Sequence, residues 1–255
     1  MEQTVVRKSG DFFHSYVSYV HKDYLSLSSF IQSLPSRFDQ GEGKVIYKGR
    51  NELREFHYEG KVLVVKSFCK PHLINRLVYG LFRSSKAQRS FEYAELFLGA
   101  GILTPQPIGY YTERLGFLLT RSYYVCLKSE CPYTYRDFKK HDFPRSKEIL
   151  KAIAETTARM HEKGYWHKDY SAGNILFRDD RKQIEIEVID LNRMAFGPID
   201  REKGCQNFER LPSSNEQLTI IAETYAQIRG FDPKICFQLM RKYIDLEEKR
   251  RAPKI

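Results

Sequence analysis

The segment HKDYSAGNIL, residues 167–176, places an acid two positions after a histidine and an amide five positions after that acid. Asp169 and Asn174 both carry side-chain oxygens, which are the ligands that Mg²⁺ takes in proteins. The spacing is either that of an ordinary polar loop or that of a site for a metal ion and phosphate groups. The rest of the chain distinguishes these two interpretations.

The chain also contains the other groups that phosphoryl transfer requires: a cation for the nucleotide phosphates and a second metal-binding acid. Lys66 lies on a strand-like segment, and Glu92 or Glu95 lies on the helical segment that follows it. Asp190 comes 16 residues after Asn174, and ILFRDDRKQIEIEVID between them has the length and pattern of a β-hairpin. Because a carboxylate at the end of a buried strand needs a partner, we expect Asp190 to return to the same metal ion.

Short alternating runs and turn residues predict that the first part of the chain is rich in strands. Three antiparallel strands are expected in KVIYKGRNELREFHYEGKVLVVKSF, at about 44–48, 52–58 and 61–68, with turns at GRN and EG. Lys66 then lies on the third strand. Two further strands are expected around a turn at about 113–116.

Two helices are expected in the same part. Apolar residues from Leu25 to Leu34 lie at roughly helical spacing, and Pro35 is expected to end this short helix. The segment SFEYAELFLGAGI has the spacing of an amphipathic helix that ends at Gly99 and Gly101.

The second part is mostly helical. A helical pattern runs from about 145 to 163 and stops at Gly164, and further helical segments follow from about residue 203. Together the two parts predict an α+β fold of two lobes. We expect one catalytic domain, divided into an N-terminal extension at 1–43, an N-lobe at 44–122 and a C-lobe at 123–255.

The net charge of +10 over 255 residues predicts attraction to an anionic partner, such as nucleic acid, a nucleotide, a phospholipid surface or a phosphorylated glycolipid. Aromatic residues are spread throughout the chain rather than interleaved with lysines on one strand, so nucleic acid is not expected. The segment LINRLVYGLFRSSKAQR has a basic amphipathic pattern. It fits either an anionic membrane surface or a helix that packs within a lobe, and both interpretations remain open.

Five cysteines, at 69, 126, 131, 205 and 236, include no CxxC pair and are expected to be reduced thiols of a cytosolic protein. The N-terminus has no apolar core of a secretory signal, and no stretch approaches 18 uncharged apolar residues. We therefore expect neither a signal peptide nor a membrane span.

Several segments resemble the bacterial lipopolysaccharide core kinases, the Kdo/WaaP-type family within the protein-kinase-like fold. These segments are VVKSF, RSFEYAELFLGAGILTPQP, HKDYSAGNILF, VIDLNR and CQNFERL. The resemblance extends from about residue 44 to 215. It implies transfer of phosphate from ATP, with Mg²⁺, to an inner-core sugar of a lipid A precursor at the cytoplasmic face of the inner membrane.

The resemblance also implies a role for each candidate residue. Asp169 would accept or steer the proton of the sugar hydroxyl, and Asn174 and Asp190 would hold Mg²⁺. Lys66 would bind the α- and β-phosphates, and Glu92, preferred over Glu95, would fix that lysine.

Two further groups would contact the nucleotide. The backbone of Thr120, Arg121 and Ser122 would bind adenine as the hinge. The glycine-rich loop of kinases is missing; instead, the turn KGRNE has only Gly49, so Arg50 and Asn51 would contact phosphate.

His167 is expected to bond the backbone near Asp190 rather than to act as the catalytic base. DLN stands at 190–192 where protein kinases have DFG, and Lys168 stands where they have arginine. No APE motif follows, and few residues separate Asp190 from GCQNFERL, which disfavours an extended peptide as substrate.

The resulting hypothesis is a kinase for a core sugar, Kdo rather than heptose, that binds an anionic lipid A–core glycolipid and the inner-membrane surface peripherally. No nucleic acid and no obligate protein partner are expected. Two alternatives remain: a kinase for protein or for a small soluble alcohol, since the same loop serves all of them, and a non-catalytic scaffold with the same fold.

Overall fold

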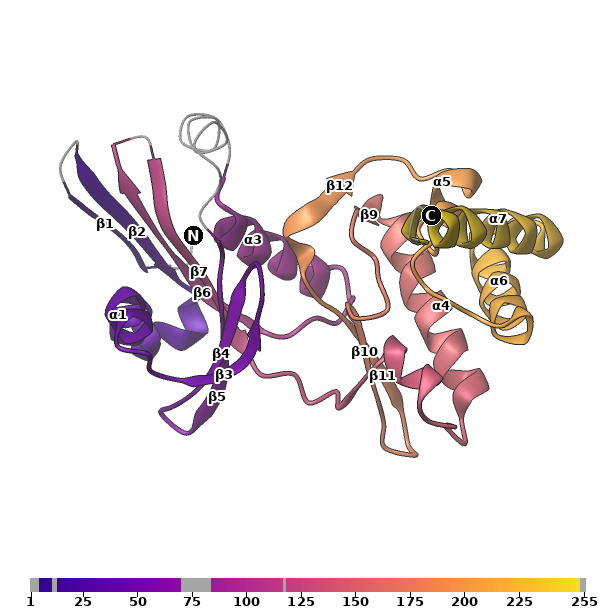
Figure 1. Ribbon diagram of the computed structural model, residues 1–255, viewed down its shortest axis with the longest axis horizontal. Helices are drawn as coiled ribbons and strands as arrows, with labels where there is room; N and C mark the ends of the chain where they lie inside the picture. The colour runs from indigo at the N-terminus through magenta and orange to yellow at the C-terminus, as the bar shows by residue number, and fades with distance from the viewer. Residues whose placement is uncertain (1–4, 11–12, 70–83, 117, 253–255) are drawn as a thin grey trace. The chain divides into compact units, whose positions relative to one another are not determined.

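The computed structural model describes residues 5–10, 13–69, 84–116 and 118–252. These residues belong to two compact units (Figure 1). The first comprises Met1–Leu96 and Pro105–Ser129, and the second comprises Phe97–Thr104 and Glu130–Ile255. No helix within the described ranges is long and apolar enough to cross a membrane. The five cysteines are free thiols, as predicted.

The first unit is built on a seven-stranded sheet in the order β1-β2-β6-β7-β5-β4-β3, in which every neighbouring pair is antiparallel. The strands are β1 (Val5–Gly10), β2 (His14–Val20), β3 (Lys44–Lys48), β4 (Glu52–Tyr58), β5 (Lys61–Ser67), β6 (Pro107–Leu115) and β7 (Leu118–Leu127). The three strands predicted between residues 44 and 68 are confirmed, as are the two around residues 113–116. The β4–β5 turn has positive φ at Glu59 and Gly60, 47° and 70°, which the EG sequence favours.

Each face of this sheet is covered by a helix. The short helix η1 (Lys22–Leu27) and α1 (Ser28–Asp39) contribute Phe30, Ile31 and Leu34 to an apolar core with Val65 of β5. On the other face, Phe91 of α3 (Lys86–Gly99) packs in a cluster with Phe68 and Tyr110. Because side chains alternate along a strand, Val65 points toward the α1 core and Lys66 points to the opposite face, which carries α3.

The N-terminal segment differs from the expectation in two respects. Residues 1–43, expected as an extension, contribute strands and α1 to the sheet and core of the first unit, because β2 pairs with β6 along its whole length. Pro35 lies inside α1 and does not end it. The missing N–H of a proline costs one helical bond. Contacts beyond it hold the last turn: Phe38 lies 4.3 Å below the Arg54 guanidinium, and its carbonyl accepts a hydrogen bond from the same side chain.

The division of the chain also differs from the prediction. A boundary between residues 122 and 123 would cut through β7, which continues to Leu127 and pairs with β5 from Tyr123 to Leu127 and with β6 on its other side. The first unit ends at Ser129 instead, and Phe97–Thr104 belongs to the second unit. A strand held on both sides by a ladder cannot be divided between two lobes.

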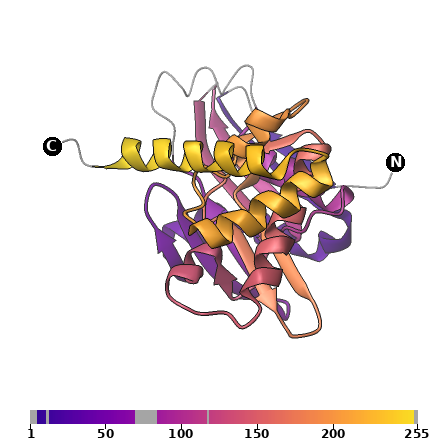
Figure 2. The same cartoon turned by 90° about the vertical axis from the view of Figure 1, so that its right-hand side faces the viewer.

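The second unit combines small β-elements with four α-helices among its described residues. The helices are α4 (Ser146–Glu162), α5 (Arg201–Gln206), α6 (Asn215–Arg229) and α7 (Pro233–Arg251), and α6 contacts both α4 and α7 (Figure 2). The remaining elements are β8 (Tyr133–Thr134), η2 (Tyr135–Lys139), β9 (Tyr165–His167), β10 (Ile175–Asp179), β11 (Ile184–Val188), η3 (Leu191–Arg193) and β12 (Met194–Phe196). The predicted helix at 145–163 is confirmed, and Gly164 follows it with φ 72°.

Candidate active site

The predicted hairpin brings Asn174 and Asp190 together. β10 pairs with β11 from Ile175 opposite Val188, and the Ile189 N–H donates to the Asn174 carbonyl at 3.0 Å. Asn174 and Ile189 therefore face each other just beyond the ladder, and Asp190 is the next residue along the chain. The hairpin that the sequence predicts is confirmed. Its geometry supports a shared site for the two side chains.

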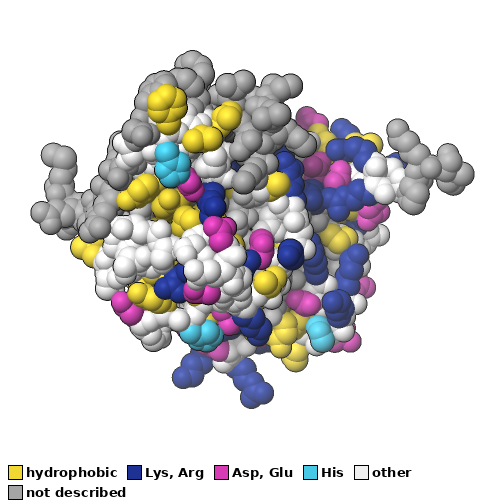
Figure 3. Space-filling model, turned by 60° about the vertical axis from the view of Figure 1, so that its left-hand side comes forward, with side chains coloured by type: hydrophobic (Ala, Val, Ile, Leu, Met, Phe, Trp, Pro, Cys, Tyr) yellow, Lys and Arg dark blue, Asp and Glu magenta, His cyan; other side chains and the backbone are white. Residues whose placement is uncertain are grey.

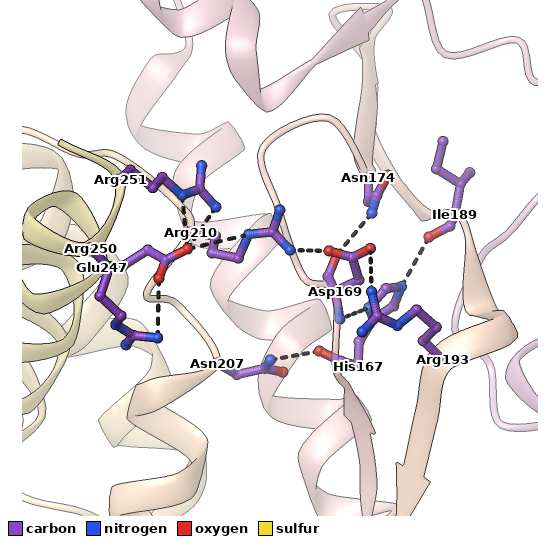
Figure 4. A network of polar contacts seen from close by, with 10 residues as sticks. All are labelled: His167, Asp169, Asn174, Ile189, Arg193, Asn207, Arg210, Glu247, Arg250 and Arg251. Carbon is purple, nitrogen blue, oxygen red and sulfur yellow. Dashed lines mark hydrogen bonds and ion pairs between the residues drawn. The ribbon is translucent and has the colours of Figure 1, made fainter. Parts of the chain in front are cut away.

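The loop from His167 to Asn174, called the catalytic loop below, is closed by a hydrogen bond from its own asparagine. The Asn174 amide nitrogen donates to the Asp169 carbonyl at 2.8 Å, across the five-residue spacing that the sequence shows (Figure 4). Since the nitrogen is used in this bond, the amide oxygen is the atom of Asn174 that can ligate a cation. Asp169, Asn174 and Asp190 are all half-buried.

Asp190 has a backbone conformation that few residues adopt. Its φ and ψ are 62° and 46°, in the left-handed region, and it precedes η3. Aspartate and asparagine enter this region more readily than other residues with a Cβ. Asn192 donates a hydrogen bond from its amide to Asp190 Oδ1. The conformation is a local strain of the kind that accumulates at functional sites.

The donor atoms of this loop fit Mg²⁺. Within the described parts of the chain, no group of three or more His, Cys, Asp or Glu residues could hold a metal ion by itself. One amide oxygen from Asn174 and one carboxylate from Asp190 are hard ligands, too few for a structural metal. They match Mg²⁺, which takes one or two protein ligands and completes its shell with water and substrate phosphates.

His167 ties the loop to the strand that leads to Asp190. Its Nδ1 accepts a hydrogen bond from the Asp169 N–H at 3.0 Å, so Nε2 carries the proton and donates to the Ile189 carbonyl at 3.0 Å. The side chain is fully buried, and burial lowers its pKa. His167 is therefore neutral and bonded to backbone on both sides. The expectation that it bonds the backbone near Asp190 is confirmed.

A buried network that the sequence analysis missed supports this histidine. Asn207 donates to the His167 carbonyl at 2.9 Å and accepts from His161 Nε2 at 2.9 Å. Tyr225 of α6 then donates its hydroxyl proton to His161 Nδ1 at 2.8 Å. Asn207 lies in the CQNFERL segment, but its contact with His167 joins residues 40 positions apart and has no local signal.

His161 makes the stability of the fold sensitive to acid. Burial lowers its pKa from 6.5 to about 3. Below pH 6.5 the unfolded chain binds a proton at this residue that the folded chain does not bind, so stability falls as the pH falls toward 3. We expect the free energy of unfolding to drop by about 2 kcal/mol between pH 6.5 and 5 from this group. Denaturant titrations at several pH values measure the slope.

The matched variants separate His161 from the other acid-sensitive groups. His161→Gln is expected to have a shallower dependence of unfolding free energy on pH than the wild type. His57→Gln, which removes a histidine that is 77% exposed, is the control variant. Equal slopes for His161→Gln and the wild type would contradict the assignment.

Two arginines, also missed, contact the carboxylate of Asp169. Arg210 Nη1 binds Asp169 Oδ1, and Arg193 Nη1 lies 3.4 Å from Asp169 Oδ2 (Figure 4). Both arginines lie in segments quoted for the resemblance, VIDLNR and CQNFERL. No local pattern assigns them to Asp169, because the pairs span 24 and 41 positions.

The remaining predicted residues lie in the first unit. Lys66 is paired with Tyr124 of β7 across the ladder, and its ammonium lies 5.2 Å from the ring centroid of Phe68. Glu92 accepts a hydrogen bond from Gln88 at 2.7 Å on its own helix. These contacts place Lys66 on the face of the sheet that carries α3.

Both glutamates of α3 contribute to the raised pKa of a tyrosine in the cross-strand row that contains Lys66. Tyr124 faces Lys66 in β5, and Tyr110 of β6 faces Tyr124. Burial chiefly raises the pKa of Tyr110 to about 12, with a contribution from Glu92. Burial also raises the pKa of Tyr124, with a smaller contribution from Glu95. The choice between Glu92 and Glu95 as the partner of Lys66 stays open.

The turn KGRNE connects β3 and β4, as its sequence predicts. The Gly49 N–H donates to the Asn51 carbonyl at 3.0 Å, and Asn51 Oδ1 accepts from the Cys69 N–H at 3.2 Å. The side chain of Asn51 thus links the turn to the segment after β5, while Arg50 is exposed. Phosphate contact by Gly49, Arg50 and Asn51 stays a prediction.

The structure does not place Thr120, Arg121 and Ser122 in a hinge. All three lie inside β7, where Arg121 and Ser122 pair with β6. The Ser122 carbonyl accepts from the Phe68 N–H at 2.9 Å, and the Thr120 hydroxyl donates to the Glu113 carbonyl. Backbone groups engaged in a ladder are not available to adenine. The expected position is corrected for that reason; the connection that leaves the sheet begins only after Leu127.

A comparison with known families agrees with the geometry of the loop. The lipopolysaccharide kinase (Kdo/WaaP) family matches residues 40–230. The chain belongs to this family. The resemblance inferred from HKDYSAGNILF and the other segments is thereby confirmed, and membership in the Kdo/WaaP family supports phosphotransferase activity on lipopolysaccharide.

A solved structure shows the same fold, and two others are less similar. The structure described as WaaP in complex with acyl carrier protein has a TM-score of 0.57 at 14% identity, covering 85% of this chain and 90% of that one. The ADP/Mg²⁺-phosphoaspartate complex of the Rio2 kinase from Chaetomium thermophilum has a TM-score of 0.49 at 14% identity, with coverages of 96% and 82%. The bifunctional kinase-methyltransferase WbdD gives 0.46 at 16% identity, with coverages of 77% and 43%. The predicted α+β, protein-kinase-like fold of this Kdo/WaaP family member is confirmed.

Proposed function

We propose that this member of the lipopolysaccharide kinase family transfers the γ-phosphate of ATP to a hydroxyl of Kdo, rather than heptose, in the inner core of a lipid A precursor. The observation that carries the proposal is that Asn174 bonds the Asp169 carbonyl and pairs with Ile189, the residue before Asp190, in a chain whose family match extends over residues 40–230. A non-catalytic scaffold would not need an acid, an amide and a second acid at these three positions.

In the proposed reaction the sugar hydroxyl loses its proton to Asp169 as its oxygen bonds the γ-phosphorus, and the bond from that phosphorus to the bridging oxygen of ADP breaks. Mg²⁺, when bound, neutralises charge on the phosphate oxygens. Asn174 and Asp190 would hold the metal ion. Lys66, fixed by Glu92 or Glu95, would bind the α- and β-phosphates, and the turn at Gly49, Arg50 and Asn51 would cover them.

The chain between Asp190 and the helices favours a compact acceptor over a peptide. α5 begins at Arg201, and within this interval η3 and β12 already occupy residues 191–196. β12 pairs with β9, with Met194 opposite His167, so this segment is held against the catalytic loop. An extended peptide needs a free edge on which to lie. These observations weigh against the alternative of a protein kinase; a small soluble alcohol remains the other alternative acceptor.

A glycolipid acceptor places the protein at the cytoplasmic face of the inner membrane, where we propose peripheral contact. The net charge of +10 favours an anionic lipid surface. Figure 3 shows Lys and Arg side chains on one face, interspersed with acidic and apolar ones. Of the basic amphipathic segment, residues 70–83 lie outside the described residues, so its contact with lipid stays a prediction.

A protein partner is the second candidate interaction. The related WaaP structure is a complex with acyl carrier protein. We propose that this chain has no obligate protein partner and uses the glycolipid alone. Activity of the purified chain on a lipid acceptor, with no other protein added, would support this.

The acceptor can be identified directly. Core glycolipid from cells that lack this gene is expected to have one phosphate fewer per molecule by mass spectrometry, and the phosphate should return when the wild-type gene is restored. Purified protein with labelled ATP and Mg²⁺ should label a Kdo-bearing lipid A precursor. Label on casein, or only on a heptose-bearing core, would overturn the proposed acceptor.

A further inference from the structure

Arg210 contacts the catalytic loop although it lies 41 positions after Asp169 in the sequence. Ser171 of the loop forms a parallel bridge with Arg210, which follows α5. The guanidinium then lies between two carboxylates: Nη1 binds Asp169 Oδ1, and Nε lies 3.8 Å from Glu247 Oε1 on α7 (Figure 4). Arg210 is therefore positioned by backbone and side chain together.

Arg193 approaches the same carboxylate from another element. Its carbonyl accepts a hydrogen bond from the Lys168 N–H at 2.9 Å, beside the pairing of Met194 with His167. Its side chain reaches Asp169 Oδ2 at 3.4 Å and is 61% exposed. The backbone of Arg193 is thus fixed, while its guanidinium is accessible from solvent.

These contacts occupy both oxygens of the residue that must receive a proton. One guanidinium faces Oδ1 of Asp169 and another faces Oδ2, so a hydroxyl has to displace at least one of them. The Arg210–Asp169 pair is partly exposed, with side-chain exposures of 30% and 22%, so a solute can reach it. A second carboxylate is the natural replacement, since arginine binds carboxylates through a planar fork.

The charges around the pair leave room for another anion. Glu247 is shared by Arg210, Arg250 and Arg251, and Arg250 also lies 3.5 Å from Glu209. Together with Arg193, four guanidinium groups therefore meet three carboxylates in this network, counted over the described side chains. Arginines therefore outnumber carboxylates among the side chains that share these ion pairs, which favours the approach of an anion.

We propose that Arg193 and Arg210 form a subsite for a carboxylate of the acceptor sugar, and that Asp169 occupies this subsite until the acceptor binds. The inference deepens the proposed function and rests on it. A keto-acid sugar such as Kdo carries a carboxylate on the ring that is phosphorylated, whereas heptose is neutral. Binding of that carboxylate would release an oxygen of Asp169 toward the hydroxyl, so acceptor choice and activation of the base are coupled.

The test measures the binding of two sugars, one with and one without the carboxylate, to the wild type and to each arginine variant. Binding of a soluble Kdo glycoside and of its carboxyl-reduced alcohol is measured by calorimetry for the wild type, Arg210→Gln and Arg193→Gln. We expect the wild type to bind the acid at least tenfold more tightly than the alcohol, and each variant to lose most of this preference. Phosphate transfer to intact and carboxyl-reduced lipid acceptors should show the same pattern in KM.

Arg145→Gln is the matched control. Arg145 binds Asp179 at 2.8 Å in the same unit, with exposures of 34% and 19%, close to those of the Arg210–Asp169 pair. This variant should keep the wild-type preference for the acid. A dephosphorylated lipid acceptor with its Kdo intact separates the two possible anions, since loss of binding there would assign the subsite to the lipid phosphates and overturn the proposal.

The binding measurement also distinguishes failure of this inference from failure of the proposed function. If the wild type prefers the acid but transfers no phosphate to any core acceptor, the subsite stands and the proposed reaction fails. If phosphate is transferred but the acid and the alcohol bind equally, the reaction stands and the subsite is wrong.

Discussion

Asp169→Ala is expected to transfer phosphate to the sugar acceptor about 10³-fold more slowly than the wild type, because a positioned general base contributes 10²–10⁴. ATP affinity should stay near the wild-type value, since the carboxylate of Asp169 contacts Arg193 and Arg210 rather than the groups assigned to the nucleotide. Single-turnover transfer from labelled ATP measures the first quantity, and equilibrium titration with a fluorescent ATP analogue measures the second.

Asp179→Ala is the control for this variant. Asp179 is an aspartate of similar exposure in the same unit, and it pairs with Arg145 at 2.8 Å. Its loss should lower stability slightly and leave the rate of transfer within a few-fold of the wild type. Undiminished turnover in Asp169→Ala would remove Asp169 from the reaction. An equal loss in both variants would show that the effect is on folding.

Asp190→Asn is expected to raise the Mg²⁺ concentration needed for half-maximal activity and to reduce transfer at least 10²-fold at limiting Mg²⁺. The amide is a neutral ligand and binds a hard cation more weakly than a carboxylate. Stability should hardly change, because asparagine also tolerates the left-handed conformation in which Asp190 lies, at φ 62°. Mg²⁺ titrations of activity and denaturant unfolding measure the two effects.

Two comparisons sharpen this result. Asp190→Ala should show the same loss of Mg²⁺ response and, in addition, a lower stability of about 1 kcal/mol from the strained backbone. Asp180→Asn changes an exposed aspartate of the β10–β11 turn and should preserve the Mg²⁺ response. A normal Mg²⁺ titration in Asp190→Asn would exclude this residue as a ligand.

Local order was accessible from the sequence alone. The strands between residues 44 and 68 follow from alternation and from a turn that tolerates positive φ. The β10–β11 hairpin follows from a strand pattern on each side of a polar turn, and its length brings Asp190 back beside Asn174. In each case the interacting residues are near in sequence, so the local pattern of residue types is enough to predict the contact.

Long-range order was not accessible in this way. Nothing in residues 1–43 shows that β2 pairs with β6, 89 to 101 positions away, so the sequence predicts an extension there. The sequence predicts a hinge at Thr120–Ser122 because no local signal shows that β7 continues to Leu127. It predicts a helix end at Pro35 because the contact of Phe38 with Arg54 comes from another element.

By itself, the sequence determined which residues share the catalytic loop and the hairpin, since spacing along one backbone specifies what its neighbours can reach. Only the tertiary structure decided what surrounds that loop. Asn207 supports His167, and Arg193 and Arg210 hold Asp169, through contacts that span 24 to 41 positions. Such contacts arise when separate elements pack together, and the chain carries no local periodicity that records them.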